Sequence, residues 1–366
     1  MNTLTRALKR LNGTQTLGRG RAFWSSFAVT AVVLTLAPAF AESYIVNNLA
    51  YFLLWTFMAL GLSLIWGHAG ILSFGQTAFF GLAGYSYGVI SINLGDANGL
   101  TWVAFAAALI LPTLLAAVVG YFMFYGGVRD VFVGIVTLSI TLVMETFMAQ
   151  TAGPEWAIGT ARLNGFNGMS NMPPLTVPWF GGEALVLEGT PFYWFVLALA
   201  LVVYLALRWL VNSRFGNVQV AIRENPDRAE MLGYNVRLYQ LAVFAIGGAL
   251  AGISGVLYTT WGSYITPSSM GLTAAALPIV WTAAGGRKDI TTTFIATVFL
   301  LWLSQTLAVR GAQYALVLMG AILLGVVLVA PDGLVLPVVR AVGRLVARKP
   351  RSDTAADARA ASQEVA

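Results

Sequence analysis

The chain has 366 residues and a net charge of +6, with 58% hydrophobic residues, 10% charged residues and no cysteine. Soluble proteins are about 45–50% apolar and about 25% charged, so this composition excludes a soluble protein and indicates an integral membrane protein. The lack of cysteine also excludes disulfides and thiolate metal sites.

Apolar runs long enough to cross about 30 Å of hydrocarbon recur along the chain, whereas the alternating segments of a β-barrel are missing. The sequence therefore predicts an all-α membrane protein with ten transmembrane helices, and it leaves open whether the two halves are structurally related. The predicted spans are 23–40, 48–66, 71–92, 100–125, 131–150, 192–211, 238–261, 272–284, 290–309 and 313–330. Together they form a transmembrane domain over residues 23–330, in which the eighth span is short.

The positions of Lys and Arg predict the orientation, because basic residues collect in cytoplasmic loops. With the N-terminus inside, only Arg162 and Arg310 of the 21 basic residues fall outside. We therefore expect both termini in the cytoplasm. The net charge is then an insertion signal for a protein surrounded by membrane lipid, and no nucleic-acid partner is needed to explain it.

The two ends of the chain carry further predictions. Residues 1–22 form a basic cytoplasmic segment, and residues 331–366 form a cytoplasmic tail that we expect to be disordered after residue 350. The first apolar run ends in APAFA, so this region also fits a cleaved signal peptide. An uncleaved first helix is favoured, because the run has the full length of a membrane span.

Residues 66–85 read WGHAGILSFGQTAFFGLAGY and place the only histidine and a glutamine in an apolar, glycine-rich run. His68 lacks the further ligands of a metal site, so a hydrogen-bonded structural role is expected, with gating or substrate contact as the alternative. A bare backbone and a polar amide at membrane depth suggest a substrate path. Candidates for that path are Gly75, Gln76 and Gly81.

A second glycine-rich span, FAIGGALAGISGVLYTTWG, lies in the other half of the chain. Small residues on one helix face allow a neighbouring backbone to approach closely. We expect close helix packing at Gly84, Gly88, Gly248, Gly252 and Gly255. Paired glycine-interrupted spans are typical of transporters with internal repeats, although ordinary close packing gives a similar pattern.

Glu145 is a carboxylate near the outer end of the fifth predicted span. A carboxylate in hydrocarbon is costly and usually faces a cavity or a partner, so Glu145 either lines a substrate path or makes an interhelical hydrogen bond. Trp281, in the eighth span, is a further path candidate. The external loop 151–191 is rich in Gly, Pro and Asn, and it is expected to cap the outer mouth or dock a partner, or to be a surface loop without a partner.

The internal loop 212–237 carries charges of both signs between apolar residues. Asn225 is placed as an N-cap, Pro226 as the first residue of a helix and Gly233 as a stop, so two short amphipathic helices are expected. Mixed charges favour a protein partner over lipid headgroups, and the alternative is a solvated connector.

The motifs of nucleotide and metal chemistry are missing from the sequence. It contains no GxxxxGK[ST] phosphate loop, no HExxH motif and no cluster of His, Asp and Glu at metal-ligand spacing. We therefore expect no catalytic residue, no bound metal and no cofactor, and any energy for transport must come from another subunit.

Four segments resemble permeases of the branched-chain amino acid ABC importers of the LivM type, in a superfamily that also takes up urea and amides. GHAGILSFGQTAFFGLAGY is similar to the family signature, with Thr77 and Ala83 as slight departures. RFGNVQVAIRENPDRAEMLGYNVRLYQLAVFAIGGALAGISGVLY resembles the family's cytoplasmic loop and following helix almost position for position. RLNGFNGM and IVWTAAGGR resemble its external and late glycine segments. The resemblance covers residues 46–333.

The resemblance implies one permease subunit of an ATP-binding cassette importer in the bacterial cytoplasmic (inner) membrane. This subunit would form half of a path for branched-chain or other hydrophobic amino acids. It implies a second permease subunit of the LivH type, two cytoplasmic ATPase subunits that hydrolyse ATP, and a periplasmic substrate-binding protein. It assigns the segment that couples to the ATPases to Arg223, Glu224, Asn225, Asp227, Arg228, Ala229, Leu232 and Gly233.

Two departures from the family pattern leave the substrate open. The late glycine pair continues as GGRKDITTT instead of G-G-x-G-T, which places Arg287, Lys288 and Asp289 in a turn that is normally small. The eighth span lacks the acidic residue that is common in the family. The pattern from Trp281 to Arg287 is also similar to permeases for urea and short amides, the alternative within the superfamily. A stand-alone channel or ion-coupled carrier is the alternative from another class, and the missing catalytic groups disfavour an enzyme.

Overall fold

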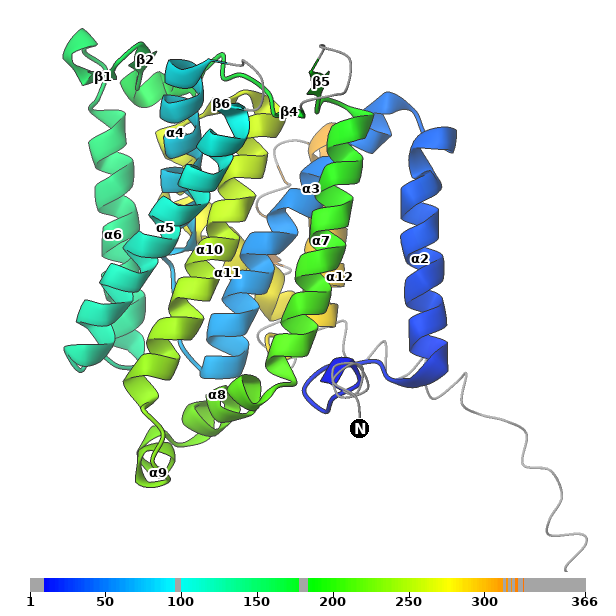
Figure 1. Ribbon diagram of the computed structural model, residues 1–366, viewed down its shortest axis with the longest axis vertical. Coiled ribbons are helices and arrows are strands. Elements are labelled where there is room, and N and C mark those ends of the chain that lie inside the picture. Colours follow the sequence, from blue (N-terminus) through cyan, green and yellow to red (C-terminus); the bar gives the residue numbers. More distant parts are fainter. Residues whose placement is uncertain are drawn as a thin grey trace, which may run out of the picture.

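The computed structural model describes residues 10–95, 100–177 and 184–311, together with a few isolated positions up to residue 325. The long helices run side by side as a bundle (Figure 1). One end carries the short helices α8 (Arg214–Glu224) and α9 (Pro226–Met231), and we call it the α8–α9 face. The opposite end carries the short strands, and we call it the strand face.

Seven helices in the described part of the chain are long and apolar enough to cross a membrane. They are α2 (Gly20–Phe40), α3 (Ser43–Leu62) continued by the π-helix η1 (Ser63–His68), α5 (Leu100–Tyr125), α6 (Val131–Ala149), α7 (Thr190–Val211), α10 (Val236–Gly262) and α12 (Ile290–Gly311).

The predicted count of ten spans is therefore not confirmed. The third predicted span appears as α4 (Gln76–Leu94), which carries several polar residues, and the eighth as α11 (Leu272–Gly285), which has only 14 residues. The tenth span and the tail fall outside the continuously described residues, as do residues 1–9.

The centre of the bundle is formed by α3 and α10, most of whose residues are buried. α10 packs against α3, α4 and α5, and α3 also contacts α7, α11 and α12. α2 stands apart, because none of its residues is buried and it touches α7 and α3 only lightly (Figure 1). Large apolar side chains such as Ile110, Leu114 and Val202 remain exposed on the outer helices, as expected for surfaces that meet lipid or another subunit.

The chain between η1 and α4 is not α-helical, although the sequence predicts a span from residue 71. Gly70 adopts φ +78°, a conformation that L side chains rarely tolerate. Phe74 donates its backbone N–H to Thr137 of α6 at 3.1 Å, and its carbonyl accepts from Thr141 at 3.1 Å. These side chains satisfy backbone groups that a helix would satisfy internally, which allows α4 to begin at Gln76.

Glycines bring α10 into direct contact with α4 and α5. A Cβ on Gly255 would collide with the backbone carbonyl oxygen of Phe80 in α4. A Cβ on Gly248 or Gly252 would instead meet side chains of α5. These three glycines of α10 therefore allow close contact with both α4 and α5.

Gly255→Ala should weaken this bundle, because the new methyl group would collide with backbone rather than with a movable side chain. The free energy of unfolding is expected to fall by about 1–3 kcal/mol, the usual cost of overpacking. Gly134→Ala in α6 is the matched control, since its Cβ would have ordinary contacts at 3.6 Å. Thermal unfolding of both purified proteins in detergent compares them, and equal melting temperatures would contradict the close contact.

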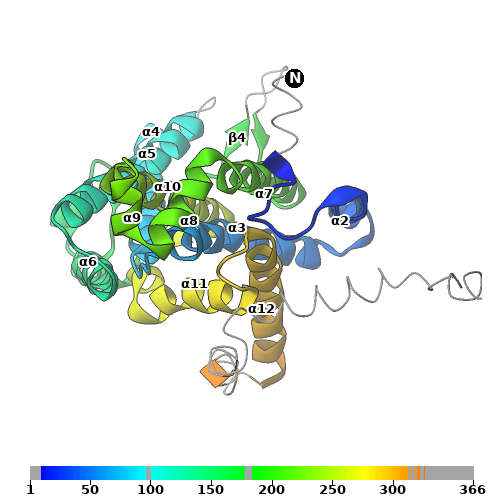
Figure 2. The ribbon, with the colours of Figure 1, turned by 90° about the horizontal axis from the view of Figure 1, so that it is seen from below.

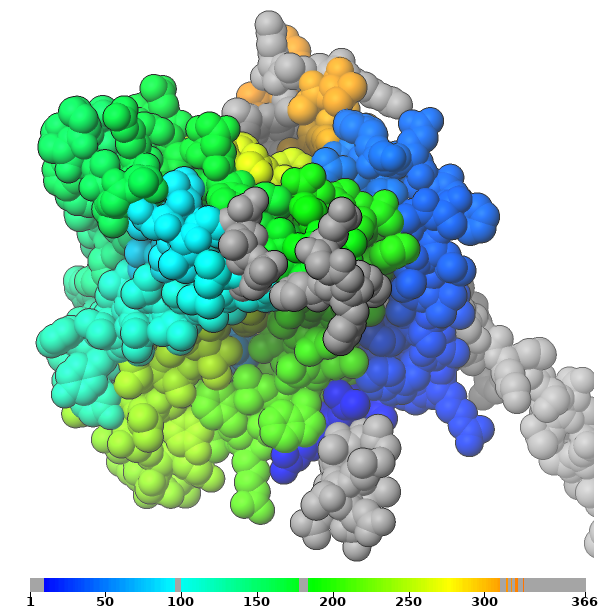
Figure 3. Space-filling model, turned by 45° about the horizontal axis from the view of Figure 1, so that its top comes forward, coloured from blue at the N-terminus to red at the C-terminus, as the bar shows by residue number. Residues whose placement is uncertain are grey.

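The segment between α6 and α7 folds over the strand face as short turns and two-residue strands. Figure 3 shows it spread over this end of the bundle, beside α4. The strand pairs are β1 (Ala157–Ile158) with β2 (Ala161–Arg162), β4 (Thr176–Val177) with β5 (Leu185–Val186), and β3 (Met169–Ser170) with β6 (Tyr264–Ile265). Two 3-10 turns belong to this segment, η3 (Pro154–Trp156) and η4 (Gly165–Asn167), and a third, η5 (Pro267–Met270), follows β6.

The β3–β6 pair joins this segment to the residues that follow α10, an association that the sequence did not predict. Two predicted packing glycines of α4 lie beneath it. Gly84 contacts Ile265 of β6, and Gly88 contacts Met172, which follows β3. The small residues of α4 thus make room for side chains from the strand face.

Candidate functional site

The two short helices predicted in the internal loop are confirmed as α8 and α9. Ser213 caps α8 by accepting from the N–H of Phe215, and Asn225 caps α9 by accepting from the N–H of Arg228 at 2.8 Å. Pro226 occupies the first turn of α9, and Gly233 adopts φ +87° just after its end. Local capping chemistry therefore sets the bounds of both helices.

A small apolar cluster holds α8 and α9 against the start of α10. Val218, Ile222 and Ala229 are buried in it and pack against Val236 and Tyr239. The amide of Gln219 also donates to the carbonyl of Tyr239 at 2.7 Å. The pair of helices is therefore a fixed part of the fold and not a solvated connector.

The outer side of this pair presents both charged and apolar groups to solvent. Met231 is 86% exposed and Leu232 is 76% exposed, and the charged residues Glu224, Asp227 and Arg228 are also exposed in this short stretch of chain. We call residues 224–232 the α8–α9 tip. An exposed apolar centre with a charged rim is typical of a protein-binding surface.

The eight predicted coupling residues have three different roles in the structure. Asn225, Ala229 and Gly233 shape the tip through a cap, a buried contact and a turn. Glu224, Asp227, Arg228 and Leu232 lie on its surface, and Arg223 connects it to the helix bundle. Sequence reasoning missed Met231 and Tyr234. Their exposure depends on how α9 is oriented, and a helix of six residues is too short for a pattern in the sequence to show that orientation.

Arg223 links the tip to the end of η1. It donates to the carbonyl of Gly67 at 2.5 Å and to the carboxylate of Glu224 at 2.7 Å. A Cβ on Gly70 would press against the Arg223 side chain. The Arg223 guanidinium holds the pKa of Glu224 below its ordinary value. A displacement of α8 would therefore act directly on the break between α3 and α4.

The same part of η1 contacts the turn between α11 and α12. Ser63 donates to the carbonyl of Arg287 at 3.0 Å, and a Cβ on Gly67 would collide with that carbonyl. His68 is buried close by, with Nδ1 3.3 Å from the carbonyl of Ser63 and with no partner for Nε2 among the described residues. The structure thus places His68 at the α8–α9 face. π-helical turns of this kind are often found at functional sites.

The predicted path residues of α4 are buried between helices. Gln76 is 2% exposed, and neither amide atom has a hydrogen-bond partner within the described part of the chain. Gly75 is the N-cap residue of α4, and Gly81 lies against the sulfur of Met270 in η5. An unpaired amide inside a bundle is costly, which is why Gln76 remains a candidate for a polar function.

Trp281 of α11 belongs to a buried aromatic cluster at the centre of the bundle. Its ring centroid lies 5.6 Å from that of Trp55, which in turn stacks on Phe80 at 5.0 Å and meets Tyr258 at 5.4 Å. The indole N–H groups of both tryptophans lack acceptors among the described residues. The structure brings this cluster next to the glycine contact of α10 with α4.

Glu145 lies half-buried on α6. Its carboxylate faces Gly271, the N-cap residue of α11, where a Cβ would approach an oxygen at 2.7 Å. A carboxylate at a helix N-terminus meets unpaired N–H groups and the positive end of the helix dipole. The predicted path residues are therefore divided between this helix end and the interior of the bundle.

Comparisons with known proteins identify a family of transport permeases. A family model described as the branched-chain amino acid transport system permease component matches residues 44–327. The chain is 27% identical over 244 residues to the probable branched-chain amino acid transport permease protein LivM of Methanocaldococcus jannaschii. The aligned region covers 58% of this chain and 66% of that relative.

Other relatives differ in the substrate that they are named for. The ribose import permease protein RbsC of Escherichia coli is 28% identical over 316 residues, covering 82% of this chain and 89% of its own length. The high-affinity branched-chain amino acid transport system permease protein LivH of Salmonella typhimurium is 24% identical over 292 residues. That aligned region covers 76% of this chain and 89% of the relative. The comparison with solved structures found no match.

Proposed function

Because the chain belongs to the branched-chain amino acid transport permease family, we propose that it is one permease subunit of an ATP-binding cassette importer. It forms half of a translocation path through the bacterial inner membrane. Its energy comes from two ATPase subunits, and a second permease of the LivH type and a periplasmic substrate-binding protein complete the assembly. Permease subunits of this family are transport proteins and not enzymes.

The α8–α9 tip is the observation that carries this proposal. It joins exposed Met231 and Leu232 to mixed charges, and the Arg223 contact with Gly67 connects it to the break between α3 and α4. A stand-alone channel or carrier has no need for such a surface. Docking of an ATPase at the tip would move α8 and, through Arg223, the helix ends that border the path.

The charges at the two ends of the bundle support one orientation in the membrane. Arg129, Arg223, Arg287 and Lys288 lie at the α8–α9 face, whereas Arg162 lies in β2 at the strand face. Basic residues collect on the cytoplasmic side of membrane proteins. We therefore propose that the α8–α9 face is cytoplasmic and that the strand face docks the substrate-binding protein.

The proposed substrate is a branched-chain or other hydrophobic amino acid, in keeping with the printed names of the LivM and LivH relatives. Urea or a short amide is the alternative, and the similarity to RbsC adds ribose to the test. Proteoliposomes that hold the full complex should accumulate radiolabelled leucine only when ATP is enclosed. If only urea or ribose is taken up, that molecule replaces the hydrophobic amino acid as the proposed substrate. Leucine uptake without ATP would refute the proposal that the protein belongs to an ATP-driven importer.

Leu232→Asp with Met231→Asp should detach the ATPases, because the apolar centre of the tip becomes charged. Truncating one well-packed interface residue costs about 2 kcal/mol or more, so co-purification should fall by more than about tenfold. Tyr44→Asp, an exposed residue at the strand-face end of α3, is the control and should leave co-purification unchanged. Normal ATPase recovery with the tip variant would remove the tip from the interface.

A further inference from the structure

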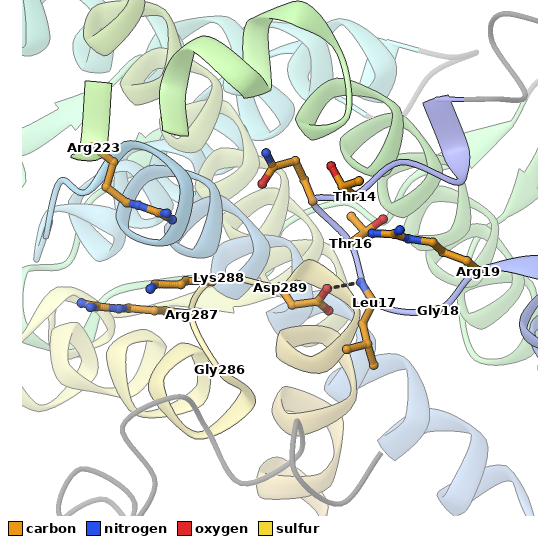
Figure 4. A pocket seen from close by; sticks show the side chains of 11 residues that line it. Thr14, Thr16, Leu17, Gly18, Arg19, Arg223, Gly286, Arg287, Lys288 and Asp289 are labelled. Carbon is orange, nitrogen blue, oxygen red and sulfur yellow. Dashed lines mark hydrogen bonds between the residues drawn. The ribbon is translucent and has the colours of Figure 1, made fainter. Parts of the chain in front are cut away.

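The turn that departs from the family pattern lines a cavity at the α8–α9 face. The cavity has a volume of about 580 Å³ and is bordered by residues 14–19, by the turn Gly286–Asp289 and by Arg223 of α8 (Figure 4). We call residues 10–19 the N-terminal strap, which crosses this face between α7 and α12 (Figure 2). The cavity therefore joins three segments that are far apart in the sequence.

Four cationic side chains surround this space. Arg223, Arg287 and Lys288 gather on one side, and Arg19 lies on the strap across from them (Figure 4). Such a group of like charges is unfavourable without a counter-ion. The cavity is open to solvent on the α8–α9 face, so a soluble anion can enter it.

The nearby carboxylates offset only part of this charge. Asp289 accepts from the backbone N–H groups of Leu17 and, at 2.9 Å, of Thr292, so it serves as a cap. Arg223 is paired with Glu224 at 2.7 Å. Arg19 and Lys288 make no ion pair with any described residue. About two positive charges thus remain uncompensated at the cavity.

The walls are fixed before any ligand arrives. Gln15 donates its N–H to the side chain of Asn212 at 3.0 Å, and the same side chain donates to Thr16 at 3.1 Å. On the other wall, the Arg287 guanidinium lies 5.1 Å from the ring centre of Trp66 and is held over that ring. A preorganised cavity binds an ion without the cost of ordering its walls.

We propose that this cavity binds the phosphate monoester or pyrophosphate group of a soluble molecule. Such a group carries about two negative charges at neutral pH and several acceptor oxygens, which matches the two uncompensated cations. A phospholipid diester carries one charge, and its acyl chains would have to enter from the side of the bundle. The bound anion would bridge Arg223 of α8 to Lys288 in the turn before α12, next to the ATPase-docking tip. The assignment of this face to the cytoplasm rests on the proposed function.

Calorimetric titration of the full chain in detergent with inorganic pyrophosphate, at constant ionic strength, tests this site. We expect saturable binding that weakens at least about tenfold in Lys288→Gln with Arg19→Gln, since hydrogen bonds to charged groups are lost. Lys288→Arg should retain binding. Arg21→Gln is the matched control, because Arg21 is also an exposed cation near the strap but does not line the cavity.

Two results would overturn the proposal. Binding that is equal in the double variant and in Arg21→Gln would show only general attraction to a basic surface. The second result concerns the wild-type protein in nanodiscs. Loss of its pyrophosphate binding when anionic lipid replaces zwitterionic lipid would assign the cavity to a lipid headgroup. The readout needs no transport, so a failed uptake assay leaves this test unaffected.

Discussion

A variant that combines Glu224→Arg with Arg228→Glu is expected to insert and fold normally but to lose ATP-driven uptake. Both side chains are exposed on the α8–α9 tip, so their exchange costs the fold little. The exchange places two guanidinium groups side by side at residues 223 and 224 and reverses the charge pattern that a partner would meet. Like charges that face each other across an interface weaken binding by several kcal/mol.

Uptake by proteoliposomes containing the whole importer measures this effect, and size-exclusion chromatography checks that the variant remains folded. The conservative pair Glu224→Asp with Arg228→Lys keeps both charges and is expected to retain most of the uptake. Full uptake by the charge-reversed protein would show that residues 224 and 228 do not couple to the ATPases. Loss of uptake in the conservative pair as well would point to shape instead of charge.

The α8–α9 pair could be predicted from sequence because its determinants are local. Asn225, Pro226 and Gly233 stand within nine residues, and each acts on the backbone beside it. The apolar runs of the membrane helices are equally local, which explains why most span positions are close to those observed. The late start of α4 was missed, because it depends on Thr137 and Thr141 of another helix.

The contacts that build the sites depend on residues far apart in the chain. Asp289 in the late turn meets Leu17 of the N-terminal strap, and Met169 pairs with Ile265. No periodicity or motif in the sequence predicts these contacts. The sequence showed that the RKD turn departs from its family, but only the fold shows that the turn lines a cavity with Arg19 and Arg223.

The N-terminal strap is held by a buried arginine at the end of α7. Arg208 is 0% exposed and donates to the carbonyl oxygens of Leu11 at 2.6 Å, Leu17 at 3.0 Å and Gly18. Its guanidinium also lies over the ring of Phe23, with 4.4 Å to the ring centre. These contacts attach the strap and the start of α2 to the end of α7.

Arg208→Met should destabilise the protein strongly and release the strap. The apolar side chain has a similar length, but it leaves buried carbonyl groups without donors. Hydrogen bonds to a charged group contribute about 1.5–3 kcal/mol each, so a total loss of about 3 kcal/mol or more is expected. Thermal unfolding in detergent measures the stability, and limited proteolysis measures the accessibility of residues 10–19.

Arg214→Met is the control for this substitution, because Arg214 is exposed in the first turn of α8. It should match the wild type in both assays. Arg208→Lys separates charge from geometry, since an ammonium group keeps the charge but cannot span several carbonyl groups as a planar guanidinium does. If the strap is held by geometry, the lysine variant is also cleaved early. A strap that resists protease equally in wild type and Arg208→Met would show that its position depends on other contacts.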